Sequence, residues 1–522
     1  MLSFWRETGR RRGNNPVLQE KRRAEPRSLM TERLDKALPR HPFDDDKLRE
    51  ECGVFGIFGS KDAAPHTALG LHALQHRGQE SAGILSFDGQ TFHIHRALGL
   101  VGDNFSENSV ISRLKGHAAI GHVRYSTAGG TILRNVQPLF AELSSGGFGI
   151  CHNGNLTNAG LLRKQLVKRG AIFQSTSDTE VIIHLMATSS YSTFLDRFID
   201  ALRQLEGAYS LVAITPKGLI GVRDPLGVRP LVLGQLEDGV QILSSETCAL
   251  DIIGAKYVRD VQPGEIVNIT RKGITSMSPF PRLKPRPCIF EHVYFSRPDS
   301  FVDQKNVYGV RKRIGAELAA EAPAKADLVV AVPDSGNPAA IGYAQAAKLP
   351  FEMGIIRNHY VGRTFIEPTD HIRHLGVKLK HNANAGQLKG KSVILVDDSI
   401  VRGTTSVKII DMVRNAGAKE VHMRIASPAI THSCFYGVDT PNREELLASR
   451  MDVDKMAGYI GADSLAFVSM DGLYRAVVGD ARNNASPQYC DACFSGEYPT
   501  SLSDLAEGDE PRQLSLISIK IQ

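Results

Sequence analysis

Short apolar segments separated by glycine-rich turns dominate the first part of the chain, from Cys52 to about residue 285. CGVFGIFGS (52–60) and FGICHNG (148–154) are typical, because their apolar runs are of strand length and end at turn residues. Helical patterns near 158–169 and 179–205 interrupt the strands. This mixture predicts an α+β domain built on layered, mostly antiparallel sheets.

The second half of the chain alternates between strand and helix patterns instead. Apolar runs at 327–333, 392–398 and 420–427 predict buried strands, and helical stretches such as 338–348 and 404–416 lie between them. Strands that alternate with helices form a parallel sheet with helices on its faces. Ligands of such sheets bind beyond the carboxyl ends of the strands, so we expect a site there.

The chain divides into four predicted parts. The residues ahead of Cys52 form a leader with arginine clusters, an acidic run and no apolar periodicity, and Met30 is an alternative start to Met1. FPRLKPRP (280–287) contains three prolines and predicts a linker. The predicted parts are the leader (1–51), a first domain (52–287), a second domain (288–500) and a C-terminal tail (501–522).

Composition excludes some classes of function. A net charge of +6 over 522 residues gives no basic field for nucleic acid, and no stretch approaches the roughly 20 apolar residues of a membrane span. Seven cysteines are too few for a secreted disulfide scaffold, which favours a reducing compartment and a cytoplasmic location. An arginine-rich transit peptide in the leader would instead indicate an organelle, although the leader's acidic residues argue against it.

Cys52 opens the first strand directly after the leader. If the chain is cut before Cys52, the thiol lies beside a free α-amine, whose pKa of about 8 lets it act as a base near neutral pH. One residue then supplies both the nucleophile and the proton acceptor. The ordinary alternative is a buried strand cysteine.

Three further segments favour the nucleophile. Arg124, at a predicted strand end, suits a carboxylate, and Asp178, ahead of a helix, can receive an amino group. Asn153 and Gly154 predict a tight turn that offers an amide and a backbone N–H to an oxyanion. Each has an ordinary explanation, as a surface arginine, a helix cap or a hairpin. Together they suit a substrate with an α-amino acid head and a side-chain carbonyl, and glutamine fits.

A strand that ends in two aspartates and a glycine-containing loop predicts a phosphate site. In SVILVDDSIVRGTTS (392–406), Asp397 and Asp398 can meet ribose hydroxyls and a Mg²⁺ ion. The loop then opens a helix, whose N–H groups and dipole suit a phosphate. A second strand-end loop, VAVPDSGNPAA (330–340), suits pyrophosphate. The candidate phosphate-binding residues of the first loop are Arg402, Gly403, Thr404 and Thr405.

The segment between these loops, 357–380, is rich in Arg, His and Lys. A solvated basic face is the ordinary explanation. Between two phosphate loops, a lid that closes on the substrate and excludes water is the stronger interpretation. Its candidate phosphate contacts are Arg357, Arg363, Arg373, Lys378 and Lys380.

Four cysteines of the second domain form a candidate metal site. Cys490 and Cys493 make a C-x-x-C pair near the end of the chain, whereas Cys288 and Cys434 stand alone. Four thiolates can bind zinc or an iron–sulfur cluster. From the residues alone zinc is the commoner explanation, and chance and redox pairing also stay open. The remaining two, Cys151 and Cys248, are expected in the core.

The motifs of the first domain resemble the N-terminal-nucleophile glutamine amidotransferases in order and spacing. The resemblance implies an N-terminal-nucleophile hydrolase sandwich with Cys52 as nucleophile and the leader as a propeptide. It further implies that Arg124 and Asp178 hold glutamine, while Asn153 and Gly154 form the oxyanion hole. The motifs are CGVFGIFG (52–59), LQHRGQESAGI (74–84), GHVRYSTAG (121–129), HNGNLTN (152–158) and SDTE (177–180).

VDDSIVRGTT (396–405) after a buried strand resembles the binding motif of type I phosphoribosyltransferases for phosphoribosyl pyrophosphate (PRPP). The resemblance implies an α/β domain with a parallel sheet, in which Ser335 joins Asp397 and Asp398 around Mg²⁺. Both halves together resemble the glutamine PRPP amidotransferase family across roughly residues 52–500.

The combined resemblance implies a specific reaction. Glutamine gives glutamate and ammonia in the first domain, and ammonia displaces pyrophosphate from PRPP in the second, which makes 5-phosphoribosylamine, the first committed product of purine synthesis. A sealed path for ammonia is expected. The iron–sulfur subclass implies a [4Fe–4S] cluster on Cys288, Cys434, Cys490 and Cys493, and the family implies a homo-oligomer inhibited by purine nucleotides.

Two other functions fit parts of the chain. The same glutaminase domain is found fused to sugar isomerase or asparagine synthetase domains, but 396–405 argues against both. A purine-sensing repressor would need a helix-turn-helix and a basic face, and neither is apparent in the sequence.

Overall fold

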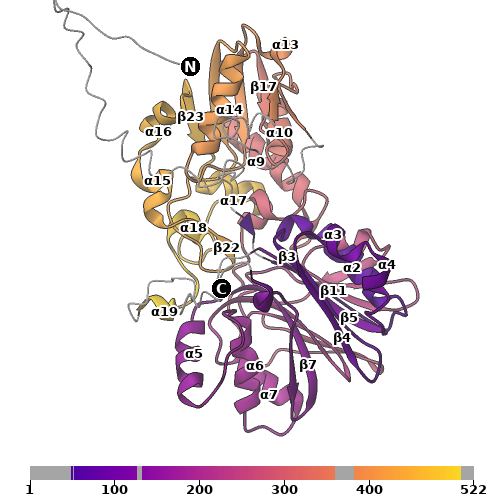
Figure 1. The fold of residues 1–522 in the computed structure, drawn as a ribbon. Helices are drawn as coiled ribbons and strands as arrows, with labels where there is room; N and C mark the ends of the chain where they lie inside the picture. The colour runs from indigo at the N-terminus through magenta and orange to yellow at the C-terminus, as the bar shows by residue number, and fades with distance from the viewer. Residues whose placement is uncertain (1–48, 51, 126–131, 359–380, 507–522) are drawn as a thin grey trace, which may run out of the picture. The chain divides into compact units, whose positions relative to one another are not determined.

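The computed structural model describes residues 49–50, 52–125, 132–358 and 381–506. Two antiparallel sheets make up the first part of this chain (Figure 1). The first sheet consists of β2 (Cys52–Phe58), β3 (Ser81–Phe87), β4 (Phe92–Leu98), β5 (Ala118–Arg124), β10 (Val232–Gln235), β11 (Gln241–Ser244) and β12 (Lys256–Asp260), in the order β12-β10-β11-β2-β5-β3-β4. The second consists of β6 (Leu139–Leu143), β7 (Gly146–Leu156), β8 (Gly207–Thr215), β9 (Gly218–Arg223), β13 (Ile266–Thr270) and β14 (Gly273–Met277), in the order β14-β13-β9-β8-β7-β6.

The two sheets pack face to face, with helices on their outer faces. Along β2, Val54 and Phe58 belong to the core between the sheets, whereas Phe55 and Ile57 pack toward the helix side. This alternation follows from the two-residue period of a strand. Helix, sheet, sheet and helix form four layers, so the predicted α+β sandwich is confirmed. The flanking helices are α2 (Ala63–Ala73) and α8 (Cys248–Asp251) on one side, and α5 (Ala159–Lys168), α6 (Thr179–Thr188) and α7 (Phe194–Leu202) on the other.

The single helical stretch expected at 179–205 is wrong, because two helices occupy it. The residues between α6 and α7, 189–193, are mostly Ser and Thr, which favour caps and turns over helix interiors. Thr193 caps α7, since its hydroxyl oxygen accepts a hydrogen bond from the Asp196 N–H at 3.2 Å. The apolar periodicity on both sides conceals this break in the sequence.

The second part of the chain contains the predicted parallel sheet, which has four strands. Alternate residues of its strands face opposite helix layers: Val329 and Ile394 belong to one core, and Val330 and Leu395 to the other. The last strand was not predicted, because four residues of mixed character give a weak pattern. The strands are β17 (Leu328–Ala331), β20 (Ser392–Asp397), β21 (Glu420–Ile425) and β23 (Ser464–Phe467), in that order across the sheet. The main helices are α9 (Val307–Glu321), α10 (Asn337–Ala347), α14 (Thr404–Asn415), α16 (Val453–Ile460) and α17 (Met470–Val478).

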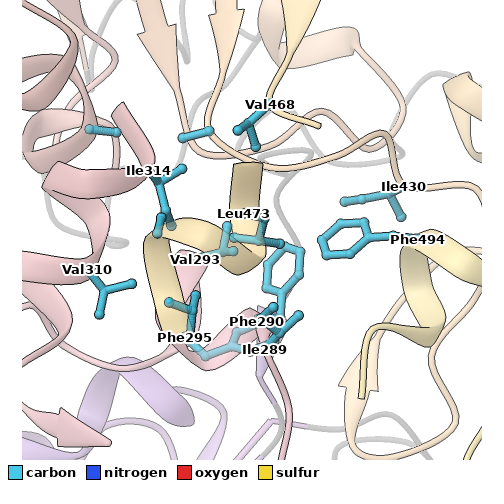
Figure 2. Packing of buried hydrophobic residues seen from close by; sticks show 14 of the residues in the cluster. Ile289, Phe290, Val293, Phe295, Val310, Ile314, Ile430, Val468, Leu473 and Phe494 are labelled. Carbon is cyan, nitrogen blue, oxygen red and sulfur yellow. The ribbon is translucent and has the colours of Figure 1, made fainter. Parts of the chain in front are cut away.

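One hydrophobic core continues from this sheet into the first domain. Figure 2 shows its centre, where Phe290 and Phe494 stack with ring centroids 5.7 Å apart. The same cluster includes Ala208 of β8 and Val228, both from the first domain. The two domains therefore share a core, which restricts their relative motion.

A buried ion network reinforces this junction. Arg77, in the 3₁₀ turn η2 (Gln75–Arg77), is fully buried and pairs with Glu246 and, at 2.7 Å, with Glu291. Glu291 also accepts a hydrogen bond from Arg229 at 3.2 Å. Burial alone would raise the pKa of Glu246, but Arg77 and His76 lower it well below its usual range. The Glu246 carboxylate is therefore ionised and paired at neutral pH.

Shorter elements complete the fold. The strand β1 (Arg49–Glu50), immediately ahead of Cys52, pairs antiparallel with β22 (Val438–Asp439). Of the helices in the described residues, none is long and apolar enough to cross a membrane. The other strands are β15 (Phe301–Val302), β16 (Lys305–Asn306), β18 (Ile355–Arg357) and β19 (His381–Ala383). The other helical turns are α3 (Val101–Phe105), α4 (Asn108–Ile111), η3 (Leu133–Asn135), η4 (Glu291–Phe295), α13 (Ala385–Leu388), η5 (Arg443–Glu445), α15 (Leu447–Arg450), α18 (Ala492–Ser495) and α19 (Ser503–Ala506).

Candidate functional site

Cys52 is the first residue of β2 and lies directly opposite Arg124, the last residue of β5. Directly opposite residues of an antiparallel pair have Cβ atoms about 4.5–5.5 Å apart, so the two side chains share one face of the sheet. Both are largely buried, with exposed fractions of 7% and 6%. The thiol and a guanidinium that can hold a carboxylate therefore lie together at the end of the sheet.

Side chains two residues apart on a strand point to the same face of the sheet, which places these side chains in the space between the two sheets. Val54 and Cys151 belong to the core there, and Cys52 and Asn153 each lie two residues away along the same strands. Burial and the nearby Cys52 together raise the pKa of Cys151. Cys52 of β2 and Asn153 of β7 thus face the same space between the two sheets.

Asn153 is fully buried and reaches across this space. Its Nδ2 lies 3.4 Å from the Ser245 hydroxyl oxygen, which also accepts a hydrogen bond from the Val54 N–H at 3.0 Å. A hydrogen bond as long as 3.4 Å is weak, so the Asn153 amide can exchange it for a developing oxyanion.

The expected tight turn at Asn153 and Gly154 is wrong, because both lie inside β7 and pair with Ser210 and Tyr209 of β8. Asn-Gly is a strong hairpin signal, but this glycine serves a close backbone approach instead. Gly154 has a φ of +138°, and a Cβ atom there would lie 2.1 Å from the Ala208 carbonyl oxygen. Only glycine fits this position.

Asp178 caps α6, as predicted, by accepting a hydrogen bond from the Thr179 N–H at 2.8 Å. Its other oxygen accepts the Leu156 N–H at 3.1 Å and lies 3.5 Å from His152 Nδ1. Burial works to raise the pKa of Asp178, but His152 and the backbone N–H groups lower it below its usual value. The ionised carboxylate, beside the end of β7, suits an ammonium group.

The second candidate site lies at the carboxyl end of β20. Asp397 and Asp398 are 2% and 1% exposed, and Asp398 Oδ2 accepts a hydrogen bond from the Ser399 hydroxyl at 2.6 Å. The loop that carries Ser335 packs against the same strand end, because the Val332 N–H donates to the Val396 carbonyl at 2.8 Å. The three candidate Mg²⁺ ligands are therefore brought to one edge of the sheet.

The phosphate loop opens α14 as predicted. Gly403 has a φ of +82° and is the N-cap, so Thr404 and Thr405 form the first turn of the helix. Their N–H groups and the helix dipole point to where a phosphate would bind. Arg402 pairs with Glu445 at 2.9 Å, so it has a partner within the chain.

The basic segment 357–380 is described only at its start. Arg357 forms an exposed ion pair with Asp334 of the neighbouring loop. The other candidate phosphate contacts, Arg363, Arg373, Lys378 and Lys380, lie outside the described residues.

The four cysteines of the second domain line one cavity with mostly apolar neighbours. The backbones of Cys288 and Cys490 form an isolated bridge, and the Cys493 carbonyl accepts the Thr431 and His432 N–H groups at 3.1 Å. Burial raises the pKa of Cys490 to about 12 and those of Cys288 and Cys493 well above their usual value. In the described part of the chain, no three His, Cys, Asp or Glu side chains converge as they would on a single ion.

The sequence did not identify several residues around these sites. Ser245 follows an apolar strand, and His152 lies within a quoted motif, but neither position has a spacing that indicates its partner. Arg311 is buried near Asp398, and burial lowers the pKa of Arg311 to about 10 while Asp398 acts to raise it. Such long-range pairing has no local sequence signal.

Comparisons with known proteins assign the two halves of the chain to two domain families. Residues 122–251 match the family described as "Glutamine amidotransferase domain", and residues 299–427 match "Phosphoribosyl transferase domain". The amidophosphoribosyltransferase of Rhizobium etli is 59% identical over 91% of this chain and 97% of its own length. The chain belongs to the amidophosphoribosyltransferase family. It is therefore a transferase of purine biosynthesis that combines a glutamine amidotransferase with a phosphoribosyltransferase.

Other members of the family are also similar over most of their length. The Bacillus subtilis amidophosphoribosyltransferase is 48% identical over 87% of this chain and 95% of its own. The Vigna aconitifolia relative, named as chloroplastic, is 53% identical over 88% and 94%. A solved structure titled as the allosteric regulatory enzyme of purine biosynthesis has a TM-score of 0.82 at 47% identity and covers 86% of this chain and 97% of that one.

The buried His122 beneath the first site predicts a pH dependence. Its Nε2–H donates to the His152 carbonyl at 3.0 Å, and burial lowers the pKa of His122 to about 3. The unfolded chain, with a histidine pKa near 6.5, binds more protons below that pH, so the free energy of unfolding falls as the pH falls. His122→Gln should reduce this fall between pH 6.5 and 4.5 by roughly 2–3 kcal/mol, as measured by urea unfolding.

The matched control is His72→Gln at an exposed position of α2, which should follow the wild-type pH dependence. An unchanged pH dependence in His122→Gln would show that His122 is not the buried neutral group described here.

Proposed function

We propose that the chain converts PRPP, glutamine and water to 5-phosphoribosylamine, glutamate and pyrophosphate, the first committed step of purine synthesis. The observation that carries the proposal is the pairing of two sites in one chain of this family. In the first site, Cys52 lies opposite Arg124 at the end of an antiparallel sheet. In the second, Asp397 and Asp398 lie at the end of a parallel sheet.

In the first half-reaction, Cys52 attacks the side-chain carbonyl of glutamine. Arg124 holds the substrate carboxylate, and Asp178 holds its ammonium group. The Asn153 amide and the Gly154 N–H stabilise the oxyanion that forms. Ammonia leaves with a proton, and water then hydrolyses the thioester to glutamate. Removal of residues 1–51 would give Cys52 the α-amine that accepts and returns this proton.

In the second half-reaction, ammonia attacks C1 of PRPP and pyrophosphate leaves. Thr404, Thr405 and the Gly403 backbone bind the 5-phosphate, assisted by Arg402. Arg363 and Lys378 of the basic segment, which lie outside the described residues, are proposed as further phosphate ligands. Ser335, Asp397 and Asp398 offer the oxygen ligands that Mg²⁺ prefers. A bound Mg²⁺ would neutralise the leaving pyrophosphate.

The four cysteines are proposed to hold a [4Fe–4S] cluster. A single tetrahedral zinc ion needs four sulfurs at about 2.3 Å, and therefore close convergence. Cys288, Cys434, Cys490 and Cys493 line one cavity, which supports a group held by all four. Burial raises the pKa of the Cys490 thiol, so a metal that binds there has to displace its proton. The cluster would serve as a structural clip between distant segments.

We also propose domain boundaries, an oligomeric state, a form of regulation and a location. The domain boundaries 52–287 and 288–500 and a homo-oligomeric state rest on the family resemblance. Inhibition by purine nucleotides is supported by the solved B. subtilis relative complexed with ADP and GMP, which has a TM-score of 0.82 at 46% identity and covers 86% of this chain and 98% of that one. We propose a cytoplasmic location. An organelle is the alternative, since plant relatives are named as chloroplastic.

The first experiment separates the two half-reactions. Cys52→Ala should abolish product formation from glutamine but leave the reaction with high ammonia within about twofold of wild type, because only the nitrogen source is lost. Asp398→Asn is the matched variant of the phosphoribosyl site and should strongly reduce product formation with either glutamine or ammonia. Loss of both activities in a soluble, folded Cys52→Ala protein would contradict the two-site assignment.

The second experiment tests the cluster. Protein purified without air should be brown, with four irons and four sulfides per chain by chemical analysis. Cys434→Ala should lose iron and lower the thermal unfolding midpoint, because the cluster joins distant segments. Cys248→Ala, a buried cysteine away from the cavity, is the control and should keep its iron. A colourless, active wild-type protein with stoichiometric zinc would overturn this assignment.

A further inference from the structure

The C-terminal residues Ser501–Leu505 pack against the short link between β7 and α5 in the first domain. The link is residues 157–158, and it directly follows the strand that carries Asn153 and Gly154. Thr157 is held twice: its hydroxyl donates to the Ser501 carbonyl at 2.9 Å, and its own carbonyl accepts the Asp504 N–H at 3.1 Å. More than three hundred residues separate the two segments along the chain.

Asp504 supplies the N-terminal cap that α5 does not have from its own sequence. Its two carboxylate oxygens accept the Gly160 and Leu161 N–H groups, each at 2.9 Å. These are the N2 and N3 groups that a cap side chain ordinarily satisfies, and a carboxylate there also suits the helix dipole. Asn158, at the cap position, makes no side-chain cap hydrogen bond, because its side chain bonds Gln204 and Glu206 instead.

Gly160 and Glu206 of the first domain also contact the C-terminal segment. A Cβ atom on Gly160 would lie 3.2 Å from the Asp504 carboxyl group, so glycine provides the room for the cap. The Ser503 hydroxyl donates to Glu206 Oε2 at 2.6 Å, and the Glu206 carbonyl accepts the Thr157 N–H at 2.9 Å. The segment therefore holds the link through side-chain and backbone groups on both sides.

The link between β7 and α5 lies next to two parts of the proposed glutamine site, the ammonium ligand Asp178 and the oxyanion-hole residue Gly154. The Leu156 N–H donates to the Asp178 carboxylate at 3.1 Å, one residue before Thr157. Gly154, whose N–H is proposed to bind the oxyanion, lies three residues before Thr157 along the chain. A shift of Thr157 would therefore be transmitted to the ammonium ligand and to the oxyanion hole.

We propose that Ser501–Leu505 positions the end of β7 for the glutamine half-reaction, with Asp504 as the principal positioning residue. The inference rests on the proposed function, because it assigns Asp178 and Gly154 to the glutamine site. It adds a residue of the C-terminal tail, which carries no recognisable sequence signal, to the determinants of glutaminase activity. The hydrogen bonds of Ser501–Leu505 described above all reach the first domain, so the phosphoribosyl reaction should not depend on them.

The test compares nitrogen donors in the Asp504→Ala variant of the full chain. The value of kcat/KM for glutamine should fall about tenfold, because small displacements of an oxyanion hole are costly, whereas the rate with ammonium chloride should stay within about twofold of wild type. Hydrogen exchange at the Gly160 and Leu161 amides should become faster. Asp504→Asn keeps one acceptor oxygen and should be intermediate.

A second variant changes the residue of the first domain that contacts the C-terminal segment. Thr157→Val keeps the shape of the side chain but removes the bond to Ser501, and should weaken glutamine use in the same direction. Asp480→Ala, an exposed aspartate that bonds only the neighbouring Ala481 N–H among the described contacts, should match wild type.

Unchanged glutamine use in Asp504→Ala and Thr157→Val would overturn the proposal, as would a parallel loss with both nitrogen donors. Wild-type enzyme is assayed alongside, to distinguish failure of this inference from failure of the proposed function. If wild type does not use glutamine at all, the proposed function fails, and this inference fails with it.

Discussion

The buried carboxylate of Glu291 is the constraint on which the arrangement of the two sites depends. It accepts hydrogen bonds from Arg77 and Arg229, and all three side chains are nearly inaccessible to water. A buried charge is tolerated only with its partners in place, so these residues fix one another's positions. Arg77 precedes β3 of the Cys52 sheet, and Arg229 Nε donates to the Tyr436 carbonyl, two residues after Cys434, at 2.7 Å. The network thus connects the glutaminase sheet, the domain junction and the cysteine cavity.

The sequence was sufficient for features that depend on local chemistry. The strand that ends at Asp397, the helix that opens after Gly403 and the helix cap at Asp178 all follow from short-range patterns of burial, turn residues and capping. Features that depend on distant partners were missed or misplaced. Gly154 is a glycine because a neighbouring strand approaches it, and Asp504 caps a helix far away in the sequence. No local pattern carries such information.

The geometry explains why the two half-reactions belong in one chain. Ammonia released to water is protonated and lost as a nucleophile, so the two sites need a passage closed to solvent. The domains share one hydrophobic core and a buried ion network, which favours a junction that keeps its shape during catalysis. The proposed cluster would add a covalent tie between Cys288 at the junction and the distant segments that carry Cys434 and Cys490.

If the two sites work as proposed, ammonia made at Cys52 is used at the Asp397 and Asp398 site without mixing with the solvent. The most direct measurement supplies glutamine labelled with ¹⁵N in its amide group together with an excess of unlabelled ammonium, and follows the isotope in 5-phosphoribosylamine. A sealed path for ammonia predicts that nearly all of the product nitrogen is ¹⁵N while glutamine is saturating. Product nitrogen with the isotope ratio of the bulk ammonium pool would contradict it.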